Sequence, residues 1–268
     1  MKFIAAAIQM LASEDKEANL RHAESAVREA AGRGARMAAL PEVFNWRGDK
    51  ADEKKNAEPL AGPTAERMAR LARELKIYLL AGSFPEEIPE ARKCYNTSLL
   101  FGPDGRPLAR YRKIHLFDVA IPRGVTALES DTREHGAEVV TAETEFGRVG
   151  LTVCYDLRFP ELYRALVDQG AKIIFVPAAF TAFTGEAHWE PLLRARAIEN
   201  QAYVIAPDQI GHNPKSFSTY GNSMIVDPWG RILARAPDKP SVITAEIDLD
   251  YLAAVREELP ALKHRRLR

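Results

Sequence analysis

The feature of this sequence that most constrains its fold is a pair of hairpin patterns set between two regions of alternating strands and helices. Residues 95–112 and 138–153 each hold two strand patterns around a turn, Gly102-Pro-Asp-Gly105 and Glu145-Phe-Gly147. Strands joined by such turns are antiparallel, which disfavours an all-parallel Rossmann sheet or a TIM barrel. We expect a mixed α/β fold in which two mixed β-sheets pack face to face, with helices outside.

Hydrophobic periodicity predicts the remaining elements. Helices are expected at residues 16–31, 62–75, 159–169, 187–201 and 248–259, and strands at 2–10, 37–40, 77–84, 172–176, 202–206, 223–226, 231–234 and 241–247. Residues 114–135 are expected to form a long loop, and such loops are usually functional or mobile. The 268 residues, 46% of them hydrophobic, suit one domain over residues 1–268 that ends in a basic tail at 260–268.

The charges of the chain balance, with 37 Lys and Arg residues against 37 Asp and Glu residues. This balance argues against nucleic-acid or membrane partners. The basic cluster Lys263-His-Arg-Arg-Leu-Arg268 is expected to be a solvated terminus or a dimer contact. No run is long enough to span a bilayer, and the two cysteines fit neither a disulfide framework nor a zinc spacing. We therefore expect a cytoplasmic protein.

One of the two cysteines, Cys154, lies where an apolar strand pattern changes into a helix pattern. Residues 149–153 alternate as in a half-buried strand, and residues 159–169 have helical spacing. A thiol at such an elbow can face a cleft, and a helix start favours the thiolate. A packing role is the alternative, because most lone cysteines behave as small hydrophobic residues. The other cysteine, Cys94, is expected to have this packing role.

Two further strand ends carry groups that could act together with a thiol. Glu42 follows a strand that ends at Pro41, and Lys113 follows the strand at 107–112. Amide cleavage needs a nucleophile, a proton shuttle and a group that stabilises the oxyanion. A glutamate can take and return the proton, a buried lysine supplies positive charge, and close pairing keeps both charges compensated. An exposed carboxylate is the alternative for Glu42, and the polar edge of a hairpin is the alternative for Lys113.

Three blocks of the sequence resemble the signatures of the nitrilase superfamily of carbon–nitrogen hydrolases. They are Leu40-Pro-Glu-Val-Phe44, Tyr111-Arg-Lys-Ile-His-Leu-Phe-Asp118 and Gly150-Leu-Thr-Val-Cys-Tyr-Asp-Leu-Arg-Phe-Pro-Glu-Leu162. They occur in the family's order, and the three together are far more specific than any one alone. The resemblance runs from Ala5 almost to the tail. It implies a four-layer α-β-β-α sandwich whose subunits pair across a helical face, so a homodimer or larger closed homo-oligomer is expected.

The resemblance also implies a role for each residue of the site. Glu42 would be the general base, Cys154 the nucleophile and Lys113 the transition-state stabiliser. The backbone N–H of Tyr155 would complete the oxyanion hole. A second family glutamate corresponds to Glu129, which would position Lys113; a plain loop carboxylate is the alternative for it. The implied reaction passes through a thioester on the cysteine and uses no metal and no cofactor.

Within the superfamily the chain is most similar to the Nit group, which includes deaminated glutathione amidase and the ω-amidase that acts on α-keto amides. Residues 113–122, 184–190, 193–203 and 226–230 carry this similarity. It implies that the partner is a small carboxylate-bearing amide, hydrolysed to an acid and ammonia. Details such as Asp156-Leu-Arg-Phe-Pro-Glu161 are closer to the deaminated glutathione amidase branch.

Several residues are candidates for contact with that substrate. Arg158 could hold its carboxylate by a bidentate contact, and a structural ion pair is the alternative. Phe180, Thr181 and His188 are further candidates; apolar packing is the alternative for the first two, and a capping or core role for the histidine.

Four positions depart from the pattern of the group, namely Arg123, Ala127, Glu186 and Asn222. All four are expected to lie in loops near the entrance of the site. There they would leave the catalytic residues intact and bear on the choice of substrate.

Other functions stay open beside a thiol amidase of the Nit type. A true nitrilase would release ammonia from nitriles but not from amides. A binding or scaffold protein on the same fold would have lost turnover, which the intact Glu42, Lys113 and Cys154 argue against. A cysteine–histidine hydrolase would pair Cys154 with His115, and Lys113 would then be dispensable.

Overall fold

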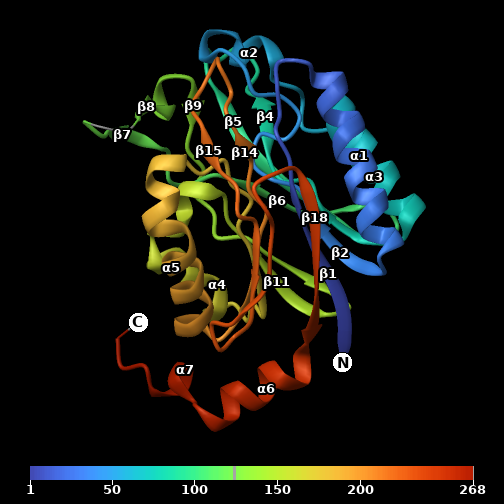
Figure 1. Ribbon diagram of the computed structural model, residues 1–268, viewed down its shortest axis with the longest axis vertical. Helices are drawn as coiled ribbons and strands as arrows, with labels where there is room; N and C mark the ends of the chain where they lie inside the picture. The colour runs from blue at the N-terminus through green and yellow to red at the C-terminus, as the bar shows by residue number, and fades with distance from the viewer. Residues whose placement is uncertain (123–124, 268) are drawn as a thin grey trace.

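Two mixed β-sheets lie face to face at the centre of the protein, and helices cover the outer face of each sheet (Figure 1). The structure is a computed structural model that describes residues 1–122 and 125–267. The expected arrangement of two mixed sheets with outer helices is confirmed. No helix within the described residues is long and apolar enough to cross a membrane.

The first sheet contains β1, which lies between an antiparallel and a parallel neighbour. Its order is β18 (Ser241–Asp248), β1 (Lys2–Gln9), β2 (Ala35–Ala39), β3 (Tyr78–Leu80), β5 (Cys94–Phe101) and β4 (Phe84–Glu87), and β6 (Pro107–Arg112) and β9 (Arg133–Glu134) also pair with β5. Strands β1 and β18 pair along their whole length, from Lys2 opposite Asp248 to Gln9 opposite Ser241. The first and last long strands of the chain are therefore neighbours.

The second sheet is built from the middle and later parts of the chain. Its order is β10 (Thr141–Thr144), β11 (Gly147–Leu151), β12 (Ile173–Phe175), β13 (Tyr203–Ala206), β16 (Met224–Val226) and β17 (Ile232–Arg235). Two short ladders lie outside the main sheets, β7 (Asp118–Ala120) with β8 (Thr126–Leu128), and β14 (Ile210–Gly211) with β15 (Thr219–Tyr220).

Side chains along β1 alternate between the two layers of core. Ala5 and Ala7 belong to the cluster that includes the second sheet, whereas Ala6 and Ile8 belong to the cluster under the helices of the first sheet. A strand whose successive side chains point to opposite faces buries both only when each face is covered. This is why the strand reads as an almost unbroken apolar run.

The helices form the two outer layers. Helices α1 (Lys16–Gly32) and α3 (Pro63–Leu75) pack on the first sheet, and α4 (Pro160–Asp168) and α5 (Ala182–Asn200) pack on the second (Figure 1). The chain also contains α2 (Glu53–Asn56), α6 (Leu249–Glu258), α7 (Ala261–His264) and three 3-10 helices, η1 (Lys50–Asp52), η2 (Glu129–Asp131) and η3 (Cys154–Arg158). Asp15 caps α1 by accepting from the Ala18 N–H at 2.9 Å.

Both predicted hairpins are confirmed, since β5 pairs antiparallel with β6 and β10 with β11. Two expectations about element bounds were wrong in detail. Helix α5 begins at Ala182 rather than 187, because Thr181 caps it and Gly185 permits the Tyr220 ring to approach closely. Residues 114–135 are not all loop, because the β7–β8 ladder, η2 and β9 lie among them.

The basic tail has some structure of its own. Residues 260–267 include α7, and Arg265 forms a bidentate ion pair with Asp168 at the end of α4, at 2.5 and 3.1 Å, but most of these residues are exposed, as expected of a solvated terminus.

Candidate active site

Three strand ends converge on one cavity of about 900 Å³. Glu42 follows β2, Lys113 follows β6 and Cys154 follows β11, and all three side chains line the cavity. Each residue is less than 10% exposed. The structure therefore brings together the thiol, the carboxylate and the ammonium group that the sequence predicts for the site.

The backbone around Glu42 is held in an uncommon conformation. Val43 has φ of 48°, a value that β-branched residues rarely adopt, and its N–H donates to Ser83 Oγ at 3.1 Å. Gly82 lies so close to the Pro41 carbonyl that a Cβ there would be 1.9 Å from the oxygen. Tight packing of these two segments therefore fixes the direction in which the glutamate leaves the strand end.

Both carboxylate oxygens of Glu42 are hydrogen-bonded. Oε1 accepts from Asn96 Nδ2 at 2.8 Å and from Lys113 Nζ at 3.0 Å, and Oε2 accepts from the Ala179 N–H at 2.8 Å. Donors from three different segments thus hold the carboxylate in one orientation. A base fixed in this way reaches a reacting proton without reorganising.

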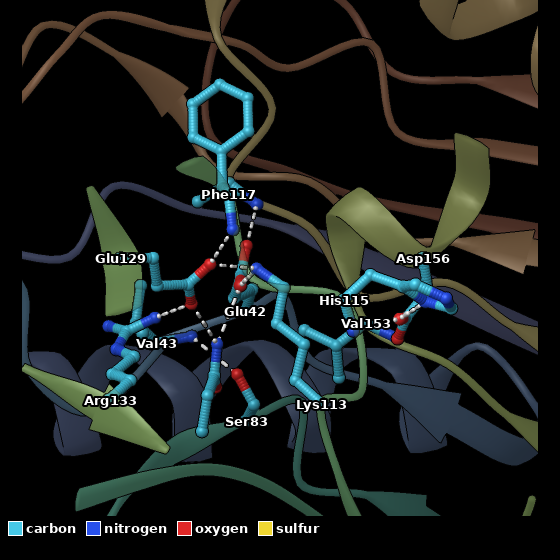
Figure 2. Close-up of polar contacts among 12 residues, drawn as sticks. Glu42, Val43, Ser83, Lys113, His115, Phe117, Glu129, Arg133, Val153 and Asp156 are labelled. Atoms are coloured by element: carbon cyan, nitrogen blue, oxygen red, sulfur yellow. Dashed lines mark hydrogen bonds and ion pairs between the residues drawn. The ribbon is translucent and has the colours of Figure 1, made fainter. Parts of the chain in front are cut away.

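Lys113 lies between two carboxylates, as Figure 2 shows. Its Nζ donates to Glu42 Oε1 and, at 2.8 Å, to Glu129 Oε2. Burial acts to lower the pKa of Lys113, but the two glutamates outweigh burial and raise that pKa above its usual range. The lysine is therefore a permanent positive charge.

Glu129 connects this lysine to a further cation. Its Oε2 also accepts from the Phe117 N–H at 2.6 Å, and its Oε1 accepts from Arg133 Nη1 at 2.5 Å (Figure 2). Burial acts to raise the pKa of Glu129, but Lys113 and Arg133 lower it to about 2. Arg133 is itself held by Glu53, so Glu129 is an ionised member of a buried network and not a plain loop carboxylate.

Cys154 opens η3 in a left-handed backbone conformation, with φ of 50°. Its N–H donates to the Pro177 carbonyl at 2.9 Å. Burial, with a contribution from Glu42, raises the pKa of the Cys154 thiol well above its usual range, while Lys113 and the Ala179 N–H act in the opposite direction. The expectation that a helix start stabilises the thiolate was wrong, because η3 has only five residues and burial dominates.

Asp156 fastens this elbow to the rest of the site. The carboxylate is fully buried; Oδ2 accepts from Tyr111 Oη at 2.6 Å and from the Val153 N–H at 2.8 Å. Oδ1 accepts from the His115 N–H at 3.0 Å and contacts His115 Nδ1 at 2.7 Å (Figure 2). The histidine also stacks on Phe159, so it is engaged away from the thiol and does not line the cavity.

Tyr155 follows the cysteine, and its backbone N–H belongs to the first turn of η3, where N–H groups lack acceptors within the helix. Its ring packs edge-on against Phe117 and Phe159 and lines the cavity. The aromatic contacts hold the peptide group that follows the thiol.

The candidates for substrate contact divide into two groups. Arg158, Phe180 and Thr181 line the cavity, and Thr181 also caps α5. Arg158 makes no ion pair with any carboxylate of the described residues, so the alternative of a structural ion pair was wrong. His188 is exposed, does not line the cavity and contacts Arg158 Nη1 at 3.2 Å, so neither a core role nor direct substrate contact fits it.

The four departures from the family pattern do not share one location. Ala127 lies in β8 and lines the cavity. Glu186 is exposed on α5, and Asn222 is buried, where its Oδ1 accepts from Arg235 Nε at 2.9 Å; neither lines the cavity. The expectation that they form an entrance loop was therefore wrong for both. Arg123 lies outside the described residues.

Other residues of the site carry no signal that sequence patterns could reveal. Asn96 binds Glu42 from the middle of a hairpin strand, and Arg133 braces Glu129. Arg47 lines the cavity. Asp208 is fully buried, and its Oδ1 accepts from the N–H of Phe180, a residue of the cavity wall, at 2.9 Å. Cys94, by contrast, is buried and donates to the Thr132 carbonyl, which fits its expected packing role.

Known proteins similar to this chain fall in one family. The family model described as carbon–nitrogen hydrolase matches residues 4–257. The deaminated glutathione amidase of Synechocystis sp. is 46% identical over 266 residues, which cover 98% of either chain. Omega-amidase NIT2 of Xenopus tropicalis is 42% identical over 265 residues, covering 99% of this chain and 95% of that protein. The crystal structure of the C. elegans NitFhit protein is 41% identical with a TM-score of 0.91; it matches 99% of this chain, which spans 65% of that one.

Proposed function

The chain belongs to the carbon–nitrogen hydrolase family, and from this membership we propose that it is a thiol-dependent amidase most like deaminated glutathione amidase. It hydrolyses a carboxylate-bearing amide to an acid and ammonia, or an amine where the amide nitrogen is substituted. Residues 1–268 act as one catalytic domain with a basic tail at 260–268. The observation that supports this function best is that a thiol, a carboxylate and an ammonium group line one cavity.

The first half of the reaction forms a thioester. Cys154 attacks the carbonyl carbon, and because burial keeps its thiol protonated, Glu42 must accept the proton as the C–S bond forms. The carbonyl electron pair moves to oxygen, where Lys113 and the Tyr155 N–H stabilise it. Glu42 then gives its proton to the leaving nitrogen as the C–N bond breaks.

The second half returns the enzyme to its starting state. A water molecule attacks the thioester carbon, and Glu42 accepts a proton from it. The tetrahedral oxyanion meets the same two donors. When the C–S bond breaks, the sulfur takes the proton back from Glu42 and the acid leaves. Lys113 stays charged throughout, since its pKa is raised, and Glu129 positions it.

The carboxylate of the substrate is proposed to bind Arg158, a half-buried guanidinium on the cavity wall. Phe180 and Thr181 would contact the rest of the substrate. An ω-amidase acting on α-keto amides is the second candidate, supported by the relative of that name that matches nearly the whole chain. A true nitrilase would need the same three catalytic groups.

Two other hypotheses have less support. A scaffold protein without turnover has no need for a charged lysine buried between two glutamates. A cysteine–histidine dyad conflicts with the contacts of His115, which is bound to Asp156 and stacked on Phe159. Under our proposal His115→Ala keeps measurable turnover and Lys113→Ala does not; the dyad requires the reverse.

The decisive experiment is a hydrolysis screen over deaminated glutathione, α-keto amides and simple nitriles. The acid product is followed by mass spectrometry and ammonia by a coupled assay, because a substituted amide releases an amine instead. Wild-type protein is expected to hydrolyse at least one amide, and Cys154→Ala none. Intact mass spectrometry is expected to detect an acyl adduct on wild-type protein quenched during turnover.

Controls separate the roles of the groups. Cys154→Ala should keep the circular dichroism spectrum and melting temperature of the wild type within a few degrees. Glu42→Gln should also block acylation, and wild-type rates in this variant would exclude it as the base. Chelation should leave the rate unchanged; loss of activity that zinc restores would contradict a metal-free reaction.

We also propose a homodimer or larger closed homo-oligomer in the cytoplasm. Ile198, Trp229 and Leu259 are each about half exposed. Ile198 lies beside Gly230, which follows Trp229, and the Leu259 carbonyl accepts from Gln201 at the end of α5. Large apolar side chains left exposed on neighbouring segments support an interface at this face.

A further inference from the structure

Arg47 is a buried cation on the wall of the catalytic cavity that the mechanism above does not use. Only 5% of the residue is exposed, yet it lines the cavity together with Glu42 and Cys154. Glu42 and Cys154 each act to raise the pKa of Arg47, so the guanidinium is within electrostatic range of both groups in the cavity that they share. A cation in this place affects whatever molecule enters the cavity.

The side chain of Arg47 is held firmly at both ends. Its backbone N–H donates to the Ser13 carbonyl at 2.9 Å, and its carbonyl accepts from Asn213 Nδ2 at 2.8 Å. Nη2 donates to the Phe217 carbonyl at 2.6 Å and Nη1 to Thr219 Oγ1 at 3.5 Å, while the Phe217 ring lies 4.9 Å from the guanidinium carbon. The group is therefore pre-oriented rather than free to swing into solvent.

No carboxylate of residues 1–122 or 125–267 forms an ion pair with Arg47. Burial lowers the pKa of this arginine to about 10, against the opposing influence of Asp208, Glu42 and Cys154. Glu42 is already hydrogen-bonded through both oxygens, and Asp208 accepts from the Phe180 N–H with one oxygen and has no partner for the other. A buried charge without an ion-pair partner is costly, so binding of an anion beside Arg47 would be favourable.

Other cations on the cavity wall have an acidic partner or more contact with solvent. Arg158 also lacks an acidic partner among the described residues, but it is only half-buried. Lys50 pairs with Asp131, and Lys113 and Arg133 pair with glutamates. Lys215 is exposed, so water solvates its charge. Arg47 thus combines burial, fixed geometry and a missing acidic partner.

We propose that Arg47 binds an anionic group of the substrate, a carboxylate, and thereby determines the preference of the enzyme for charged amides. The inference rests on the proposed amidase function and adds a second anion site to that of Arg158, so that the carboxylate of a short amide binds Arg47 and a second carboxylate, in a longer substrate, binds Arg158. The guanidinium has further N–H donors beyond the two in use, and its planar edge matches the geometry of a carboxylate. A substrate with carboxylates at both ends would satisfy both arginines.

The test compares charged and neutral amides of equal length. Succinamate and glutaramate are the charged substrates, and butyramide and valeramide are their neutral counterparts. For Arg47→Gln, kcat/KM is expected to fall by roughly 30-fold or more on the charged pair, the loss typical of removing one partner of a buried charge pair. On the neutral pair the change should stay within about threefold, and Arg47→Lys should recover part of the loss.

Lys215→Gln is the matched control, because it removes one positive charge from the same cavity at an exposed position. It is expected to change all four rates by no more than about twofold. Equal loss on charged and neutral amides in Arg47→Gln, or loss on neither, would overturn the proposal. If iodoacetamide, which is neutral, alkylates Cys154 at the same rate in Arg47→Gln and in wild type, the substitution has not changed the reactivity of the thiol.

A second readout does not depend on amide hydrolysis. If wild-type protein hydrolyses none of the four amides and none of the compounds screened above, the proposed function fails. The ratio of Cys154 alkylation rates by iodoacetate and by iodoacetamide still reports on anion binding. This ratio is expected to fall by about threefold or more in Arg47→Gln; an unchanged ratio contradicts the proposal.

Discussion

At the scale of single residues, the site is a chain of alternating charges. Arg133, Glu129, Lys113 and Glu42 follow one another, each bound to a neighbour of opposite sign. Burying any one of them alone would be unfavourable, and removing one member leaves an uncompensated charge. The charges therefore hold one another in place.

This chain makes stability depend on pH through Glu129. The pKa of Glu129 in the folded protein is lowered to about 2 from an ordinary value of 4.5. Its ionised form therefore stabilises the fold fully above about pH 4.5, and the contribution is lost as the pH falls toward 2. We expect Glu129→Gln to lower the free energy of unfolding by about 3 kcal/mol at pH 7. Urea denaturation of both proteins measures this difference.

The pH series supplies the control for that prediction. The difference in unfolding free energy between wild type and Glu129→Gln should shrink between pH 6 and pH 3. A difference that stays constant over this range would show that Glu129 does not titrate as the network requires. Glu24→Gln is a matched comparison, because this half-buried acid pairs with Arg67 far from the cavity.

Sequence patterns singled out the proposed catalytic residues more readily than the residues that surround them. Cys154, Glu42 and Lys113 lie at strand ends inside recognisable blocks. Asn96 and Arg47 do not, because an amide or a guanidinium in a strand or loop is common and its partner lies far away in the sequence. Only the fold shows that each one lines or braces the site.

At the scale of elements, the turn from β11 into η3 determines where Cys154, the proposed nucleophile, lies. Cys154 has a left-handed backbone conformation, which costs free energy for a residue with a side chain. Asp156 offsets this cost by accepting hydrogen bonds from Tyr111, from the Val153 N–H and from His115. The carboxylate is a clamp between the elbow and the end of β6.

The clamp can be tested by Asp156→Asn, which replaces one acceptor oxygen with a donor. We expect about a 10- to 100-fold loss in kcat/KM, because displacing the nucleophile by a fraction of an ångström weakens catalysis. The melting temperature should also fall by several degrees, as is usual when a buried acceptor is lost. Enzyme kinetics and thermal denaturation give the two readouts.

His115→Ala is the comparison for the clamp, since it removes one partner and keeps the carboxylate. It should be milder than Asp156→Asn in both readouts. Wild-type kinetics in Asp156→Asn would mean that the elbow holds its shape without the clamp.

Features that depend on local sequence were predicted correctly, whereas a feature that depends on packing was not. Hairpins have local turn signals, so both were found. The expectation that Cys154 prefers the thiolate was wrong, because a short 3-10 helix has a weak dipole and burial of the side chain disfavours charge. Burial depends on packing by distant segments, which local patterns do not contain.

At the scale of the whole molecule, the half-exposed apolar residues Ile198, Trp229 and Leu259 bear on assembly. We expect wild-type protein at micromolar concentration to sediment as a dimer or larger closed oligomer, and Trp229→Glu to shift it toward the monomer. A charge in the centre of an apolar interface is strongly unfavourable. Analytical ultracentrifugation distinguishes the species.

The control for assembly is Leu128→Glu, a change at another half-exposed apolar residue, which lies in β8 at the cavity. It should leave the sedimentation coefficient unchanged. A wild-type protein that is monomeric across the concentration range would contradict the proposed oligomer.

The layered fold as a whole was predictable in outline but not in its strand order. Alternating regions around two hairpins, with the family blocks, predicted facing sheets. The pairing of β1 with β18 joins residues more than two hundred positions apart, and no periodicity shows which strands become neighbours. The order of strands in a sheet depends on how the apolar faces of all the strands and helices pack against one another in the whole fold.

The pairing of β1 with β18 has a consequence for synthesis. As the nascent chain leaves the ribosome, β1 can pair with β2 early, but its other edge stays open until residues 241–248 have emerged. An unpaired strand edge can recruit strands of other nascent molecules. During translation, the open edge of β1 is therefore the part of this sheet that most needs a ribosome-associated chaperone to prevent aggregation.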